Sequence, residues 1–144
     1  MSAKVTIHTA VYPPAVNQMV GWGGELGTEF HKLERQTIGA AQRLVPSDYS
    51  KRRLLRDSIK VGKRGESARG IWTEIGSDRP YALYVESGTK PHTIRPRNGT
   101  HLVFHWRKIG RVVRMTSVSH PGNRAYRYLE NGLVVAFTRW INSA

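Results

Sequence analysis

Polar and apolar residues alternate at the N-terminus and then recur at helical spacing. Val5 and Ile7 lie on one face of the alternating stretch, which predicts a strand or an extended arm over residues 1–15. From Val16 to Leu44 apolar side chains return every three or four residues, as in an amphipathic helix. Glycines in the first third of this helix each cost roughly 1 kcal/mol. We therefore expect the helix to begin late and to end before Pro46.

Two hairpins follow, each predicted from a pair of short runs rich in β-branched and aromatic residues. The predicted strands are an entry strand over Leu54–Ile59 that continues through Ser58–Val61, then Ile71–Ile75, Leu102–Trp106 and Val112–Val118. Polar, glycine-bounded Gly62–Gly70 is predicted to be the long tip of the first hairpin. Strand alternation favours a core-facing position for Trp72 and Trp106.

A short helix is predicted between the hairpins and a longer one after them. Pro80 fits the first turn of the short helix, with Asp78 as its cap. Gly88 is placed to end that helix with a positive φ. The terminal helix is expected to take Asn123 as its cap and to present an apolar stripe from Tyr126 to Trp140 that includes Phe137.

This order of elements predicts an α+β fold. We expect a mostly antiparallel twisted sheet packed against a long N-terminal helix and a C-terminal helix, with residues 16–144 as a single domain. The longest apolar run near the C-terminus, Leu133–Phe137, is far too short to cross a bilayer, so no membrane partner is expected.

The charge is unevenly distributed along the chain. Lys and Arg outnumber Asp and Glu by 23 to 10, and the whole excess lies in residues 51–144. No acid lies between Glu86 and Glu130. A one-sided basic surface attracts either nucleic acid or the acidic face of another protein. The residues predicted for this partner surface are Arg52, Arg53, Arg56, Lys63, Arg64, Arg95 and Arg97.

The residues that usually carry catalysis form no recognisable set. The chain has no cysteine, which excludes disulfides, thiolate zinc sites and cysteine nucleophiles. The spacing of His92, His101, His105 and His120 matches no metal-ligand motif. Nothing in the sequence requires Asp57, Glu74 and Asp78 to meet. We therefore predict no enzyme, no metal and no cofactor, and keep a metal-dependent hydrolase only as the weakest alternative.

One motif stands out in the short helix and the loop after it. Its residues are Tyr81, Tyr84, Val85, Glu86, Gly88, Thr89, Pro91 and His92, followed downstream by His120, Pro121 and Gly122. This pattern resembles the HK97 gp10-like proteins of tailed bacteriophages, and the resemblance covers roughly residues 16–140. Glu86 lies among basic residues, and two interpretations remain open for it: an ion pair with Arg95 or Arg97, or a contact between subunits.

The resemblance implies a function that the composition alone does not give. It implies a tail completion or head–tail joining protein, a virion component made in the host cytoplasm that forms a homo-oligomeric ring between the tail tube and the head-side connector. Its partners would be other neck and tail proteins, with possible contact to DNA in the channel. The alternative from the basic residues is a small cytoplasmic nucleic-acid-binding protein.

Overall fold

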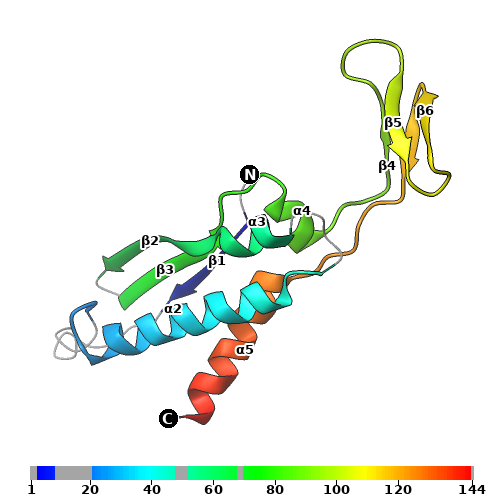
Figure 1. Ribbon diagram of the computed structural model, residues 1–144. Helices are drawn as coiled ribbons and strands as arrows, with labels where there is room; N and C mark the ends of the chain where they lie inside the picture. The colour runs from blue at the N-terminus through cyan, green and yellow to red at the C-terminus, as the bar shows by residue number, and fades with distance from the viewer. Residues whose placement is uncertain (1–2, 9–20, 48–51, 68–69, 144) are drawn as a thin grey trace.

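The computed structural model describes residues 3–8, 21–47, 52–67 and 70–143, and these residues form a body and an arm (Figure 1). The elements of the body are β1 (Ala3–His8), α2 (Glu25–Leu44), α3 (Arg52–Asp57), β2 (Ile59–Ser67), β3 (Gly70–Ser77), α4 (Ala82–Ser87) and α5 (Tyr128–Asn142). The arm, residues 89–123, contains β4 (His92–Ile94), β5 (Leu102–Trp106), β6 (Arg111–Met115) and β7 (Val118–His120). The predicted α+β class is confirmed.

The sheet of the body has the order β1–β3–β2, and both neighbouring pairs are antiparallel. Alternate residues of β3 are buried, beginning with Ile71 and Thr73, and these face the helices. The register places Val5 of β1 and Val61 of β2 on either side of Ile75, so all three strands contribute to one apolar face. The predicted alternation at the N-terminus is therefore confirmed for Ala3–His8; residues 9–15 lie outside the described part.

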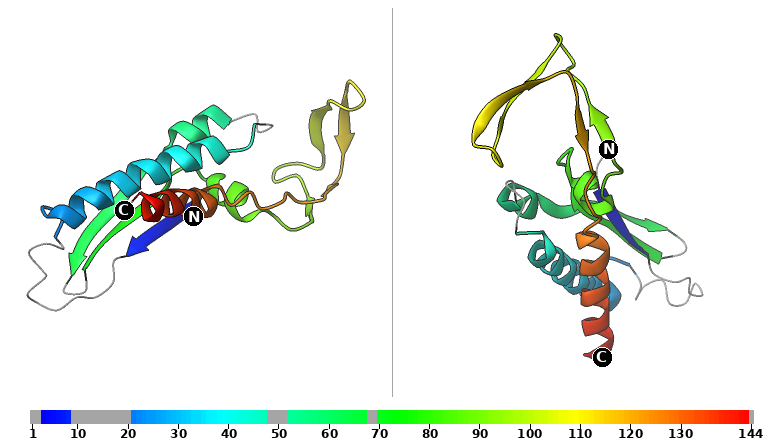
Figure 2. Two further views of the ribbon diagram at one scale, coloured as in Figure 1. Left: turned by 90° about the horizontal axis from the view of Figure 1, so that it is seen from below. Right: turned by 90° about the vertical axis from the view of Figure 1, so that its right-hand side faces the viewer.

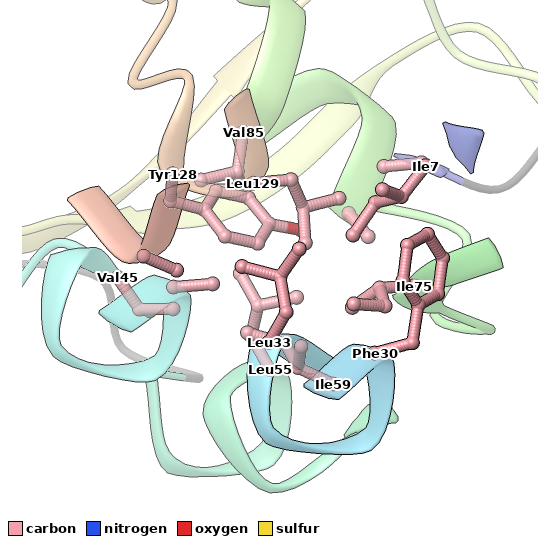
Figure 3. Packing of buried hydrophobic residues seen from close by; sticks show 14 of the residues in the cluster. Ile7, Phe30, Leu33, Val45, Leu55, Ile59, Ile75, Val85, Tyr128 and Leu129 are labelled. Carbon is pink, nitrogen blue, oxygen red and sulfur yellow. The ribbon is translucent and has the colours of Figure 1, made fainter. Parts of the chain in front are cut away.

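The core lies between this sheet face and the helices (Figure 3). Its largest fully buried apolar side chains are Tyr128, Leu55, Ile71, Ile75 and Leu129. Helix α5 packs along α2, and Gly132 makes this possible. A Cβ atom at Gly132 would lie 2.8–2.9 Å from backbone and Cβ atoms of Ala41. The two helices therefore touch backbone to backbone at this point.

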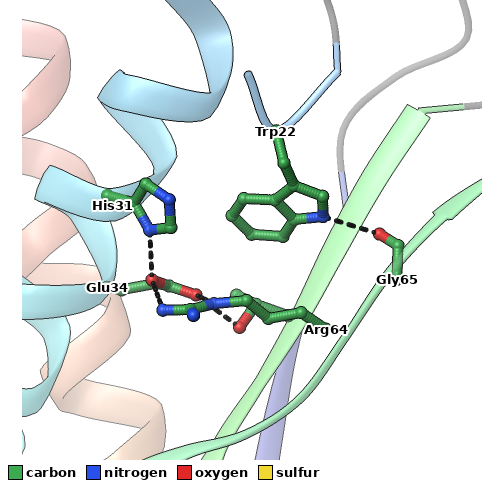
Figure 4. A network of polar contacts seen from close by, with 6 residues as sticks. Trp22, His31, Glu34, Arg64 and Gly65 are labelled. Atoms are coloured by element: carbon green, nitrogen blue, oxygen red, sulfur yellow. Dashed lines mark hydrogen bonds and ion pairs between the residues drawn. The ribbon is translucent and has the colours of Figure 1, made fainter. Parts of the chain in front are cut away.

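A buried carboxylate joins α2 to the sheet (Figure 4). Glu34 is buried, and its Oε1 accepts hydrogen bonds from Arg64 Nε at 2.8 Å and Thr73 Oγ1 at 2.6 Å. Its Oε2 lies 2.5 Å from Arg64 Nη2 and 3.0 Å from His31 Nδ1. The Trp22 ring covers the guanidinium of Arg64, with Cζ 5.4 Å from the ring centroid. The charge pair is thus satisfied by several hydrogen bonds, as a buried ion requires.

These contacts set the ionisation of Glu34. Burial raises the pKa of this carboxyl, but hydrogen bonds from Arg64, Thr73 and His31 outweigh it and lower the pKa from 4.5 to about 2. The carboxylate is therefore charged at neutral pH.

The long helix and the pairing of the first hairpin follow their predictions, but the entry and the tip of that hairpin do not. Helix α2 begins late, at Glu25, and ends just before Pro46, as expected. Leu54–Ile59, however, is mostly the helix α3 rather than an entry strand, because Ser58 turns the chain by bonding to Leu55 O through both its N–H and its hydroxyl. Gly62–Gly70 is not a loop either, since β2 runs to Ser67 and β3 starts at Gly70.

The aromatic residues of the strands also differ from their prediction. Trp72 lies on the outer face of the sheet, because its neighbours Ile71 and Thr73 take the inward positions, and its ring lies over Gly65. Trp106 is 40% exposed in the arm. Strand period alone cannot decide which face of a sheet the helices cover.

Glu34→Gln is expected to lower the free energy of unfolding by about 2–4 kcal/mol at neutral pH, since it leaves the guanidinium of Arg64 without a full counter-charge. The matched control is Glu29→Gln on the same helix. Glu29 pairs with Lys32 at the surface and accepts the indole N–H of Trp140 at 3.3 Å. Gln keeps an acceptor for Trp140, so this replacement should change stability far less than Glu34→Gln does. Urea unfolding measures both.

The pH dependence provides a second readout of the same variant. Because the pKa of Glu34 is lowered by folding, its contribution to stability is present above about pH 4.5 and is lost as the pH falls towards 2. The stability difference between wild type and Glu34→Gln should shrink over that range. A difference that stays constant down to pH 2 would contradict the assigned ion pair.

Candidate assembly site

The motif of the short helix forms a joint between α4 and the start of α5. The Glu86 carboxylate accepts hydrogen bonds from the backbone N–H groups of Leu129 at 2.9 Å and Glu130 at 3.1 Å. The backbone carbonyl of Glu86 also accepts the N–H of Arg127 at 3.0 Å. Arg127 has a left-handed φ of 48°, so these bonds hold the chain in a conformation that non-glycine residues avoid. Glu86 therefore caps α5 from another helix.

The next motif residues close the base of the arm. Thr89 and Asn123 exchange backbone hydrogen bonds of 2.9 and 3.1 Å, and the Thr89 hydroxyl accepts a further bond from Asn123 N–H. Beyond them β4 pairs with β7, placing His92 opposite His120 with ring centroids 5.1 Å apart. His120 Nδ1 accepts the N–H of Gly122 at 3.0 Å. The upstream motif and the His-Pro-Gly segment thus form one structural unit.

Gly88 is required where the two segments cross. Its φ is 72°, as predicted, and a Cβ there would lie 2.6 Å from Asn123 O and 2.7 Å from Ala125 N. Both neighbours are backbone atoms that cannot rotate away. The position therefore excludes side chains for two independent reasons, the backbone conformation and the lack of space.

An open groove of about 620 Å³ lies beside this joint. Its lining includes motif residues from both segments: Tyr81, Tyr84, Gly88, Thr89, His92 and His120. Tyr84 is 58% exposed. The motif therefore has two sides: Val85 and Glu86 contact the body, whereas Tyr84 and His92 line the open groove.

Three of the expected caps and pairs are replaced by other contacts. Asp78 does not cap α4; it bonds to Lys60 Nζ at 3.0 Å, which lowers the pKa of the Asp78 carboxyl. Asn123 does not cap α5, which starts later and is capped by Glu86. Of the two interpretations of Glu86, the ion pair with Arg95 or Arg97 is wrong, because its two oxygens bond to backbone N–H groups of α5. The contact between subunits stays a prediction.

The arm is strongly basic. It contains seven Lys or Arg residues and no Asp or Glu: Lys90, Arg95, Arg97, Arg107, Lys108, Arg111 and Arg114. None of residues 89–123 is buried, and the arm extends away from the body in every view (Figure 2). It consists of two short ribbons, β4–β7 and β5–β6, each of two antiparallel strands.

The predicted basic surface therefore separates into distinct parts. Arg95 and Arg97 are exposed on the arm, whereas Arg56 and Lys63 are exposed on the body. Arg64 is largely committed to Glu34 and does not offer a free charge. The side chains of Arg52 and Arg53 lie outside the described part of the structure. Five arm cations were not singled out from the sequence, because nothing in their local pattern shows that this segment leaves the body.

Each of the carboxylates considered for catalysis bonds to a lysine or an arginine. Glu74 bonds to Lys4 at 3.2 Å, Asp78 bonds to Lys60, and Asp57 pairs with its neighbour Arg56 at 3.1 Å. Among the described residues there is no group of three or more His, Asp or Glu side chains placed to bind a metal ion. No helix in the described ranges is long and apolar enough to span a membrane.

The most important residue missed from the sequence is Glu34. Its position could have been found, because Phe30, Leu33 and Thr37 are buried around it on the same face of α2. A buried carboxylate inside an apolar stripe requires a cation or hydrogen-bond donors as partners. The identity of that cation, Arg64, depends on the register of β2 and could not be read from spacing.

Comparison with known proteins supports the resemblance. Residues 31–88 match the model of the HK97-gp10-like family, whose description reads "Bacteriophage HK97-gp10, putative tail-component". The match runs from α2 through α4 to Gly88, so it includes Glu34, Arg64 and the first half of the motif. The similarity to this phage tail-component family is thereby confirmed. No curated protein and no solved structure gave a match.

Gly88→Ala is expected to destabilise the protein by about 2–4 kcal/mol, from backbone strain together with the clash against Asn123 and Ala125. Gly110→Ala is the matched control. Gly110 has a similar φ of 67° but no atom within 4 Å of its Cβ position, so its replacement should cost only about 1–2 kcal/mol. Thermal unfolding compares them, and equal losses would show that the joint is looser than described.

Proposed function

We propose that this protein is a tail completion or head–tail joining component of a tailed bacteriophage, assembling as a ring between the tail tube and the head-side connector. Its place would be the neck of the virion, and its partners would be further copies and other neck and tail proteins. The observation that carries the proposal is the family match over residues 31–88, which indicates a structural tail component.

The architecture supports an assembly role over a catalytic one. The residues of the family motif form a joint and line a groove. They act through backbone amides and through the Glu86 carboxylate that caps α5, and not as a set of catalytic residues. The arm places a charged, exposed surface far from the core. An extension with no buried residue has little use within a single copy, and heterologous contacts between copies close into rings when the rotation allows it.

Loss of the protein is expected to leave DNA-filled heads and separate tails, because a joining component acts after both parts are complete. Electron microscopy of lysates from a phage lacking this gene measures the outcome, with the wild-type gene supplied in trans as the control. Joined, infectious virions from the mutant would contradict the proposal.

A small cytoplasmic nucleic-acid-binding protein is the second candidate, and the arm favours it. A two-stranded ribbon fits the major groove of DNA, and the seven cations of the arm lie beside an exposed Trp106. We still favour a protein partner, because the basic residues are divided between arm and body and no recognition element is present among the described residues.

A gel-shift assay separates the two candidates. With submicromolar protein, a short random duplex and near-physiological salt, we expect no stable complex. A stable complex whose affinity falls steeply with salt, by roughly one log unit per log salt for each phosphate contact, would favour the nucleic-acid function instead.

A further inference from the structure

The outer side of α5 carries an uncovered apolar row. Val134, Phe137 and Ile141 are 58%, 45% and 54% exposed, and they follow one another at helical spacing. Glu130 lies on the same face one turn before Val134, and its side chain is 60% exposed. The opposite side of the helix packs on α2 through Gly132 and Ala136. The row is thus a second apolar face of α5 that the described part of the chain does not cover.

The β5–β6 ribbon has an apolar face of its own. The register pairs Leu102 with Met115 and Phe104 with Val113, and directly opposed residues point to the same side of a ribbon. Trp106 follows on that side. These side chains remain at least partly exposed, and an isolated two-stranded ribbon is marginally stable in water. This face therefore needs a cover that the arm does not supply.

The two uncovered surfaces cannot meet within one copy. The arm and the free end of α5 lie at opposite ends of the molecule in Figure 1, and the turned views in Figure 2 agree. Charge also limits which surfaces of two copies can meet. The arm contains no acid, so two arms repel each other, whereas all ten acids of the chain lie outside it.

We infer that the apolar face of the β5–β6 ribbon of one copy lies across the Val134–Phe137–Ile141 row of α5 in the next copy. This contact buries both uncovered faces at once, and it keeps the acid-free arms of neighbouring copies apart. It is heterologous, arm to helix, so each copy still offers one free arm and one free helix, and the chain of contacts continues from copy to copy. The inference deepens the proposed function, on which it rests, by naming the surfaces through which the ring would form.

An α5-to-α5 dimer is the main competing arrangement. It would cover the row on both copies but leave the ribbon faces exposed, and it would stop at two copies. Contact of the arm with nucleic acid would leave the α5 row uncovered. Of these three arrangements, only the arm-to-helix contact covers both apolar surfaces.

The absence of cysteine from the chain allows a direct test by disulfide cross-linking. Val113→Cys places a thiol on the inferred face of the ribbon, and Val134→Cys places one on the α5 row. Each change nearly preserves side-chain volume. The matched control combines Val134→Cys with Val103→Cys, because Val103 is 64% exposed on the other face of the same ribbon. Both pairs are oxidised in purified protein over a range of concentrations and in virions from cells that supply the variant.

The double variant Val113→Cys/Val134→Cys should give a ladder of linked multimers, at least roughly tenfold stronger than the Val103 control, because a disulfide forms only between closely placed Cβ atoms. Mixing the two single variants should give one linked dimer, and neither alone should link. Linkage of Val134→Cys with itself, equal linkage through Val103, or no linkage in either sample would overturn the inference. Absence of the protein from virions, with linkage retained in purified protein, would count against the proposed function and not against the contact.

Discussion

The structure depends on the hydrogen bonds that one carboxylate accepts from the start of another helix. Glu86 holds the first turn of α5, while Thr89 and Asn123 pair beside it and close the base of the arm. Closing an excursion of 35 residues costs on the order of 3 kcal/mol in chain entropy. Two hydrogen bonds to a charged group contribute roughly 1.5–3 kcal/mol each. The joint therefore offsets the cost of carrying an arm that has no core.

Much of the fold could be predicted from the sequence, because it depends on local patterns. The late start of α2 follows from the cost of glycine, its end follows from Pro46, and the positive φ of Gly88 follows from its place after a short helix. The helix α3 was missed although Leu54 and Leu55 favour a helix, because six residues are too few to show a helical period. Only burial of Leu55 beneath α2 separates a strand from a short helix here.

The site was found in part, and the limit has a physical cause. The sequence showed that the Glu86–His92 motif and the His120–Gly122 segment belong together, but not how. Glu86 was expected to meet a charged side chain, yet its partners are backbone amides, which every residue has and which no pattern reveals. Likewise, the register of β2 shifts between Val61 and Arg64. The spacing of residues along the strand therefore cannot predict that Arg64 pairs with Glu34.

The contact of Gly132 with Ala41 bears on the geometry of any closed assembly. Because backbone meets backbone there, the angle between α5 and the rest of the body is set by the main chain and not by side-chain rotamers. In a closed ring, each copy is rotated relative to the one before it by a full circle divided by the number of copies. A small error in this angle accumulates around the ring. A bulkier residue at position 132 would tilt the α5 row relative to the arm. In the proposed ring, the contact between Gly132 and Ala41 would therefore help to set the curvature.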